Sequence, residues 1–151
     1  MPDLVGTWRL VEWTFSVDDQ KQRKPFGGDP VGLLTYTEDG HMSATLMRRE
    51  RPQPDTTTLS AAPAGERAQI AAGYVAYAGP YRREGDTVIH QVEVSLFPNW
   101  VGGEQVRTIT WIENENGGYD LELATPPEPT EGGRKAVNRL RWRRTDNGDA
   151  R

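Results

Sequence analysis

The stretch TVIHQVEVSLF at residues 87–97 alternates between two sets of side chains. One set is apolar apart from a single imidazole: Val88, His90, Val92, Val94 and Leu96. Because successive side chains of an extended strand point to opposite faces, this period of two predicts a long β-strand with one apolar face. If that face points inward, a histidine lies among the apolar side chains of an interior.

Seven further segments have strand character and are bounded by turn residues. We expect these strands at residues 4–15, 33–37, 41–47, 80–84, 104–113, 119–125 and 134–144. Glu38-Asp39-Gly40 and Gly85-Asp86 are typical of hairpin turns. Eight sequential strands with mostly short connections predict an antiparallel up-and-down β-barrel, because closure removes exposed sheet edges. A barrel of about eight strands has room for one small ligand.

The period of two is interrupted once, and there we expect one inserted α-helix near residues 63–77. Ile70, Tyr74 and Tyr77 fall at i, i+4 and i+7, which is one helical face. Pro63 suits a first helical turn, and Gly79-Pro80 would end the helix. The expected fold class is therefore all-β with this one helix, in a single domain over residues 1–145 and a disordered tail at residues 146–151.

Composition narrows the function classes. The chain has 151 residues, a net charge of −4 and no cysteine, so thiolate chemistry is excluded and a nucleic-acid partner is not expected. No secretory segment starts the sequence and no apolar run approaches the roughly 20 residues of a membrane span, so we expect a cytoplasmic protein without a membrane partner. Two distant histidines without clustered carboxylates predict no metal site, and no phosphate-binding loop or other cofactor motif is found, so no cofactor is expected.

Motifs spread over residues 4–144 point to a known family. They are Gly6-Thr7-Trp8, Gly32-x-Leu34-x-Tyr36-x-x-Asp39-Gly40-x-Met42, Tyr77-x-Gly79-x-Tyr81, His90-x-x-x-x-Ser95-x-x-Pro98-Asn99-Trp100-x-Gly102 with Arg107, and Leu140-x-Trp142-x-Arg144. Together they resemble the lipocalin-like domain family of bacteria and fungi. The resemblance implies a calycin-type barrel with an internal cavity, a structural Trp8 covered by an arginine such as Arg144, and binding of a small hydrophobic molecule. Some barrels of this general type serve as isomerases or cyclases in natural-product pathways.

His90, Arg107 and Tyr77 are the candidate catalytic residues. A His90 imidazole among apolar groups could accept or give a proton near neutral pH, and an inward Arg107 could clamp a carboxylate or stabilise an enolate oxygen. The alternatives are structural: His90 as a satisfied interior histidine, and Arg107 paired with Glu93 or another carboxylate, or packed over an aromatic ring. The Tyr77 phenol could donate to a carbonyl or act as an acid, or simply pack in the core.

Eight further side chains are expected to contact a ligand: Tyr36, Met42, Tyr74, Tyr81, Val92, Val94, Trp100 and Trp111. Three functions follow. The first is binding of a small, largely hydrophobic molecule in the barrel cavity. The second is a cofactor-independent cyclase or isomerase acting on a natural-product intermediate of polyketide type. The third is a structural or partner-binding barrel whose interior is filled by its own rings; whether the chain forms a homo-oligomer stays open.

Overall fold

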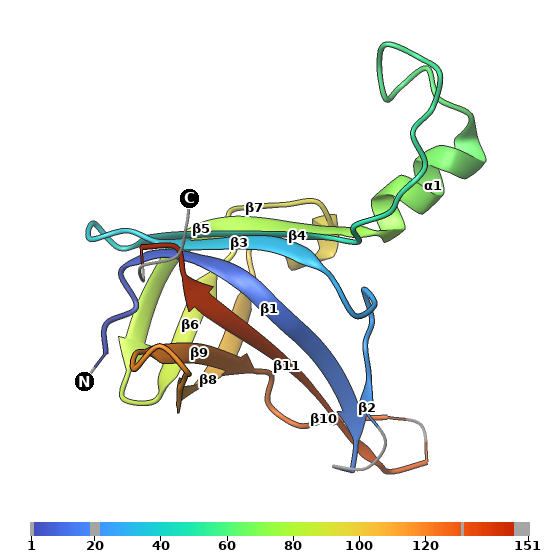
Figure 1. Cartoon of the computed structure of the whole chain (residues 1–151). Helices are drawn as coiled ribbons and strands as arrows, with labels where there is room; N and C mark the ends of the chain where they lie inside the picture. Colours follow the sequence, from blue (N-terminus) through green and yellow to red (C-terminus); the bar gives the residue numbers. More distant parts are fainter. Residues whose placement is uncertain (1, 19–21, 131, 147–151) are drawn as a thin grey trace.

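Eight antiparallel strands form a closed barrel in the computed structural model, which describes residues 2–18, 22–130 and 132–146. They are β1 (Gly6–Val17), β3 (Val31–Tyr36), β4 (His41–Met47), β5 (Tyr74–Glu84), β6 (Thr87–Gln91), β8 (Glu104–Glu113), β9 (Tyr119–Ala124) and β11 (Lys135–Arg144). Each strand pairs with the next along the chain, and β11 returns to pair with β1 (Figure 1). The predicted all-β barrel of eight strands with one helix is confirmed.

Four short elements and one helix complete the fold. The short elements are β2 (Gln22–Arg23), β7 (Val94–Ser95), β10 (Glu128–Pro129) and the 3-10 turn η1 (Pro98–Trp100). The helix α1 (Ala64–Ala72) belongs to an arm that extends away from the barrel beyond the ends of β4 and β5 (Figure 1), and none of its residues is buried. No helix in the described ranges has the length and apolar character needed to cross a membrane.

Trp8 is fully buried in the barrel core, as the resemblance implied. Its indole N–H donates to the Leu4 carbonyl oxygen at 2.9 Å, and the Arg144 guanidinium lies over its ring at 4.3 Å from the centroid. Arg144 also donates to the Val5 carbonyl, which joins the first and last strands to the segment before β1. The first and last strands of the barrel are therefore held together by contacts around the Trp8 indole.

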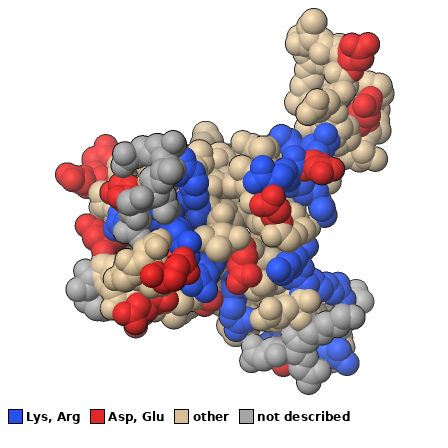
Figure 2. All heavy atoms as spheres, in the orientation of Figure 1, with Lys and Arg blue, Asp and Glu red and all other residues tan. Residues whose placement is uncertain are grey.

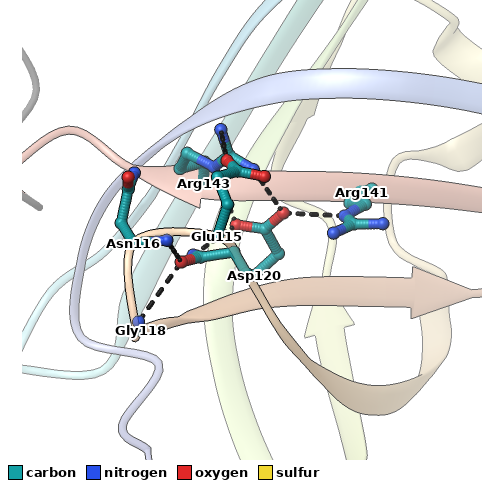
Figure 3. A network of polar contacts seen from close by, with 7 residues as sticks. Glu115, Asn116, Gly118, Asp120, Arg141 and Arg143 are labelled. Atoms are coloured by element: carbon teal, nitrogen blue, oxygen red, sulfur yellow. Dashed lines mark hydrogen bonds and ion pairs between the residues drawn. The ribbon is translucent and has the colours of Figure 1, made fainter.

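A buried carboxylate fastens β9 to β11 on another part of the barrel (Figure 3). Asp120 accepts hydrogen bonds from Arg141 Nε at 2.7 Å, Arg143 Nε at 2.9 Å and Asn114 Nδ2 at 3.0 Å. The Asn114 side-chain oxygen accepts from two amides of the turn that joins β8 to β9. Burial by itself raises the pKa of Asp120, but the hydrogen bonds from Arg143, Asn114 and Arg141 outweigh it and hold that pKa below its ordinary value.

Charged side chains of both signs are interspersed on the face shown in Figure 2. Figure 2 shows acidic and basic groups next to one another over the barrel part of one face, with no patch of a single sign covering that face. The arm that carries α1 is mostly uncharged in the same view.

The predicted helix is wrong beyond residue 72. Tyr74 and Tyr77 lie in β5, where the ladder from Met47–Tyr74 to His41–Pro80 pairs this segment with β4. The extended conformation is favoured over a helix at residues 74–77 because it forms the hydrogen bonds of this ladder and buries Tyr77, whereas no residue of α1 is buried. Gly79 does not cap a helix either.

Gly79 lies where two stretches of backbone approach closely. A Cβ added at this position would lie 1.8 Å from the Gln91 carbonyl oxygen. Only a residue without a side chain fits there, which is why a glycine interrupts a strand.

The strand predicted at residues 87–97 is broken by a shift of register opposite Gly79. Tyr81 pairs with His90, but Ala78 pairs with Val94, so one extra residue is inserted between the two pairs. A slip of one residue turns every later side chain to the opposite face. Val88, His90 and Val92 are therefore buried, whereas Val94 and Leu96 are 61% and 46% exposed, so the inward placement of these last two is wrong.

Candidate functional site

A cavity of about 420 Å³ occupies the barrel, and all eight strands contribute to its wall. The apolar part of the wall comprises Trp13, Leu34, Ala44, Leu46, Val75, Trp100, Leu123, Leu140 and Trp142. The polar part comprises Tyr77, His90, Gln105, Arg107, Thr125, Glu128 and Asn138. Small-molecule sites have volumes from roughly 300 Å³ and combine an apolar wall with a few polar groups, and this cavity has both properties.

His90 is held between two tyrosines. The Tyr36 hydroxyl lies 2.7 Å from Nε2 and the Tyr77 hydroxyl lies 2.8 Å from Nδ1, so both ring nitrogens are in hydrogen bonds. The imidazole has no exposed surface, and burial, reinforced by the positive charge of Arg107, lowers its pKa to about 3. His90 is therefore neutral at physiological pH, with one nitrogen donating and the other accepting.

The two phenols beside His90 also stay neutral. Burial raises the pKa of Tyr36 well above its ordinary value, and the neighbouring Tyr77 raises it further. Burial likewise raises the pKa of Tyr77, against a smaller opposing effect of Arg107. Tyr36, His90 and Tyr77 are therefore all uncharged and act only as hydrogen-bond donors and acceptors.

Arg107 is the cationic group of the cavity wall. Its guanidinium donates to the Val106 carbonyl oxygen at 2.8 Å and to the Gln105 side-chain oxygen at 3.0 Å. Among the described residues it has no carboxylate within ion-pair distance, so the alternative of a pair with Glu93 or another carboxylate is not realised there. A half-buried guanidinium without a counter-charge favours an electron-rich group placed beside it.

Trp100 lines the cavity. Tyr36 does not line it but contacts His90, which does. Trp100 contacts the edge of the Tyr77 ring, with centroids 5.8 Å apart. Tyr36, Met42 and Val92 are buried in the core, although they do not line the cavity.

Four other predicted ligand contacts lie elsewhere. Tyr81 packs on Tyr36 and its hydroxyl donates to a backbone carbonyl in the turn after β3. Trp111 packs against Trp8, with centroids 6.0 Å apart. Tyr74 and Val94 line a groove formed by β4, β5 and β7 that is separate from the barrel cavity.

Sequence reasoning missed the polar groups contributed by the loop after β9 and by β11. The side-chain oxygen of Asn138 accepts a hydrogen bond from Trp13 Nε1 at 2.8 Å, and the backbone N–H of Asn138 donates to the Thr125 hydroxyl. The signal available was the shared face of Asn138, Leu140 and Trp142 in the last strand. Among the described residues, no group of three His, Asp or Glu side chains is arranged to hold a metal ion.

A closed antiparallel barrel of eight strands around a central cavity is a lipocalin-like barrel. The comparison with protein families agrees: the lipocalin-like domain model matches residues 5–145, and the chain belongs to this family.

Individual proteins similar to the chain include one relative by sequence and one solved structure. The first is the 4'-hydroxy-3'-methoxypropiophenone carrier protein ppsC of Aspergillus oryzae, which is 32% identical over 111 residues, or 68% of this chain and 96% of the relative. The second is the solved structure of the uncharacterized protein YLR301w from Saccharomyces cerevisiae, with a TM-score of 0.43 and 17% identity. That match covers 90% of this chain and 52% of the yeast protein, about half of its length.

Proposed function

We propose that the barrel binds a small, largely apolar molecule in its cavity. The observation that carries the proposal is the cavity of about 420 Å³, whose mainly apolar wall includes the guanidinium of Arg107. Among the described residues this guanidinium has no ion-pair partner. Burying an apolar ring against this wall would provide most of the affinity, at roughly 25 cal/mol per Å² removed from water. Arg107 and the Tyr77 hydroxyl would fix the orientation of one polar group.

The relative from Aspergillus oryzae supports this proposal and narrows the ligand class. Its name makes it a carrier of 4'-hydroxy-3'-methoxypropiophenone, an aryl ketone with one aromatic ring and one carbonyl group. A molecule of that size and polarity suits a cavity with aromatic walls and one cationic position. We therefore propose an aryl ketone or a similar carbonyl-bearing aromatic molecule, carried rather than converted.

Three wall tryptophans provide the readout for a binding test. Trp13, Trp100 and Trp142 line the cavity, so an aromatic ligand placed among them should quench their fluorescence. Titration with 4'-hydroxy-3'-methoxypropiophenone, confirmed by calorimetry, should give saturable binding with a stoichiometry of one. Mass spectrometry of molecules that co-purify with the protein would identify the natural ligand.

A cavity-filling variant is the matched control for this titration. Ala44 lies in the wall on β4, and its side chain is 4% exposed. Ala44→Phe should occupy the ligand space and abolish binding while the variant keeps its strand-rich circular dichroism spectrum. Equal binding by wild type and a folded Ala44→Phe variant would exclude the barrel interior as the site.

A cofactor-independent cyclase or isomerase is the second candidate. It is favoured by one observation, the presence of His90 and Arg107 in the wall of the same cavity. Because both nitrogens of His90 are already bonded, proton transfer to a substrate would pass through the Tyr77 hydroxyl, while Arg107 would stabilise an enolate oxygen. Mass-spectrometric detection of a rearranged product with wild type, but not with Arg107→Gln, would favour this candidate over a carrier.

The third candidate, a structural or partner-binding barrel with a filled interior, has the least support because the interior holds a cavity. A single domain over residues 1–145, a cytoplasmic location, the lack of a nucleic-acid partner and the oligomeric state stay predictions from the sequence. Residues 147–151 of the expected tail lie outside the described residues.

A further inference from the structure

We infer that the hydrogen-bond chain Tyr36–His90–Tyr77 runs in one direction, which leaves the Tyr77 hydroxyl hydrogen for the ligand. The cavity then selects molecules that present an oxygen acceptor without a hydrogen, such as a ketone, over the corresponding alcohol. This inference rests on the proposed function and adds the polarity of the group that the site recognises.

The inference begins with a count of hydrogens. Neutral Tyr36, His90 and Tyr77 carry one labile hydrogen each, and two hydrogen bonds join the three groups. Two of the three hydrogens are used, and one is left over. It belongs to whichever phenol accepts from the imidazole N–H, so the tautomer of His90 decides where the free donor lies.

Burial distinguishes the two arrangements. Tyr36 is 1% exposed, does not line the cavity, and has no hydrogen-bond partner besides His90 among the described residues. A free hydrogen on Tyr36 would therefore be buried without an acceptor, which costs roughly 1–3 kcal/mol. Tyr77 lines the cavity, where water or a ligand can accept its hydrogen.

The favoured arrangement follows from this difference. Tyr36 donates to Nε2 of His90, the imidazole carries its hydrogen on Nδ1, and that N–H donates to the Tyr77 oxygen. The Tyr77 hydrogen is then available in the cavity. Its own oxygen is already an acceptor for Nδ1–H, so Tyr77 faces a ligand as a donor.

Two neighbours strengthen the donor character of the wall. Arg107 has only donors and no carboxylate partner in the described part of the chain. Trp142 lines the cavity, and its buried indole N–H finds no acceptor among the described residues. The Gln105 side-chain oxygen already accepts from Arg107. The wall also contains one carboxylate, that of Glu128, which is exposed on β10. The charge that acts on His90 and Tyr77 is that of Arg107, not of Glu128. Beside Tyr77 and Arg107 a ligand carbonyl therefore finds hydrogens, whereas a ligand hydroxyl adds one more hydrogen there.

The first test reads the tautomer in the ligand-free protein. Histidine labelled with ¹⁵N should show a protonated Nδ1 and an unprotonated Nε2 for the His90 ring in an NMR spectrum that correlates ring nitrogens and hydrogens. A protonated Nε2 would overturn the inference, whatever the protein binds.

The second test compares three probes that share a phenyl ring: propiophenone, the alcohol obtained by its reduction, and propylbenzene. The wild type should bind the ketone about tenfold more tightly than the alcohol, which is the usual effect of one unpartnered polar group. Tyr77→Phe should remove most of this preference while the affinity for propylbenzene changes less than twofold. Equal affinities for ketone and alcohol in the wild type would overturn the inference, because the wall would then not select an acceptor.

Failure of the proposed function is distinguishable from failure of the inference. If none of the three probes binds, the barrel does not carry a molecule of this class, and the proposed selectivity falls with it. If propylbenzene binds but the ketone has no advantage, the barrel is a binding cavity and only the inferred selectivity for an acceptor is wrong.

Discussion

Acidification should destabilise the fold through the buried imidazole of His90. The folded state keeps this ring neutral down to a pKa of about 3, whereas a histidine in the unfolded chain has a pKa near 6.5. Below about pH 6.5 the His90 imidazole is therefore protonated in the unfolded chain but stays neutral in the folded protein. The contribution of neutral His90 to stability is fully present above about pH 6.5 and is lost progressively as the pH falls towards about 3.

The magnitude follows from the distance between the two pKa values. Each pH unit below the unfolded pKa is worth about 1.4 kcal/mol until the folded pKa is reached. Between about pH 7 and about pH 5 the protein should lose about 2 kcal/mol of unfolding free energy through His90 alone. For a domain of this size that is a large part of a net stability of roughly 5–15 kcal/mol.

Urea unfolding of wild type and His90→Gln measures this loss. Glutamine offers one donor and one acceptor to the two tyrosines but has no pKa in this range. The stability of the wild type relative to the variant should therefore fall by about 2 kcal/mol on going from about pH 7 to about pH 5. Parallel pH profiles would refute the reasoning, as would an NMR titration of the His90 ring with a midpoint near 6.

Three other predictions use the same structure. Arg107→Gln should weaken binding of an aryl ketone by about tenfold in calorimetry, with a change in unfolding free energy under about 1 kcal/mol, because Arg107 has no carboxylate partner among the described residues; unchanged affinity would remove Arg107 from the site. Asp120→Asn should lower the free energy of unfolding in urea by about 2 kcal/mol. This is less than the loss of a fully buried ion pair, because the arginine partners of Asp120 are 28% and 24% exposed. An unchanged free energy of unfolding would show that the network in Figure 3 is dispensable. Gly79→Ala should lower the free energy of unfolding by at least about 2 kcal/mol or prevent folding, since its Cβ would meet a backbone oxygen. The control Gly65→Ala has open space around its Cβ in α1, so it should leave the free energy of unfolding unchanged or raise it by up to about 1 kcal/mol. Equal effects at both positions would contradict the close approach at Gly79.

The alternation of apolar side chains was enough to predict the barrel. Every one of the eight barrel strands overlaps a segment that shows strand character in the sequence. The burial of Trp8 under Arg144 also followed from the resemblance, because a Gly-x-Trp opening and a late arginine are local features. These successes concern patterns that a single segment contains.

The errors concern features that two distant segments create together. Tyr74 and Tyr77 fit a helical face as well as a strand, and only the pairing with β4 decides between them. The register shift that turns Val94 outward arises where Gln91 approaches Gly79, and no sequence pattern within residues 87–97 predicts it.

The site was predictable in part for the same reason. His90 was found because an imidazole stands out on an apolar face. Its two tyrosine partners come from β3 and β5, so the chain of three groups exists only after closure of the barrel. Asn138 and Trp142 reach the cavity from the last strand, and their role depends on its pairing with β1.

A crystal structure of the protein with 4'-hydroxy-3'-methoxypropiophenone would test the binding claim most directly. We expect the molecule inside the barrel, with its ring among Trp13, Trp100 and Trp142 and its ketone oxygen accepting hydrogen bonds from Tyr77 and Arg107. Density for the molecule only in the groove beside Tyr74 and Val94, with the barrel interior holding water, would contradict the claim.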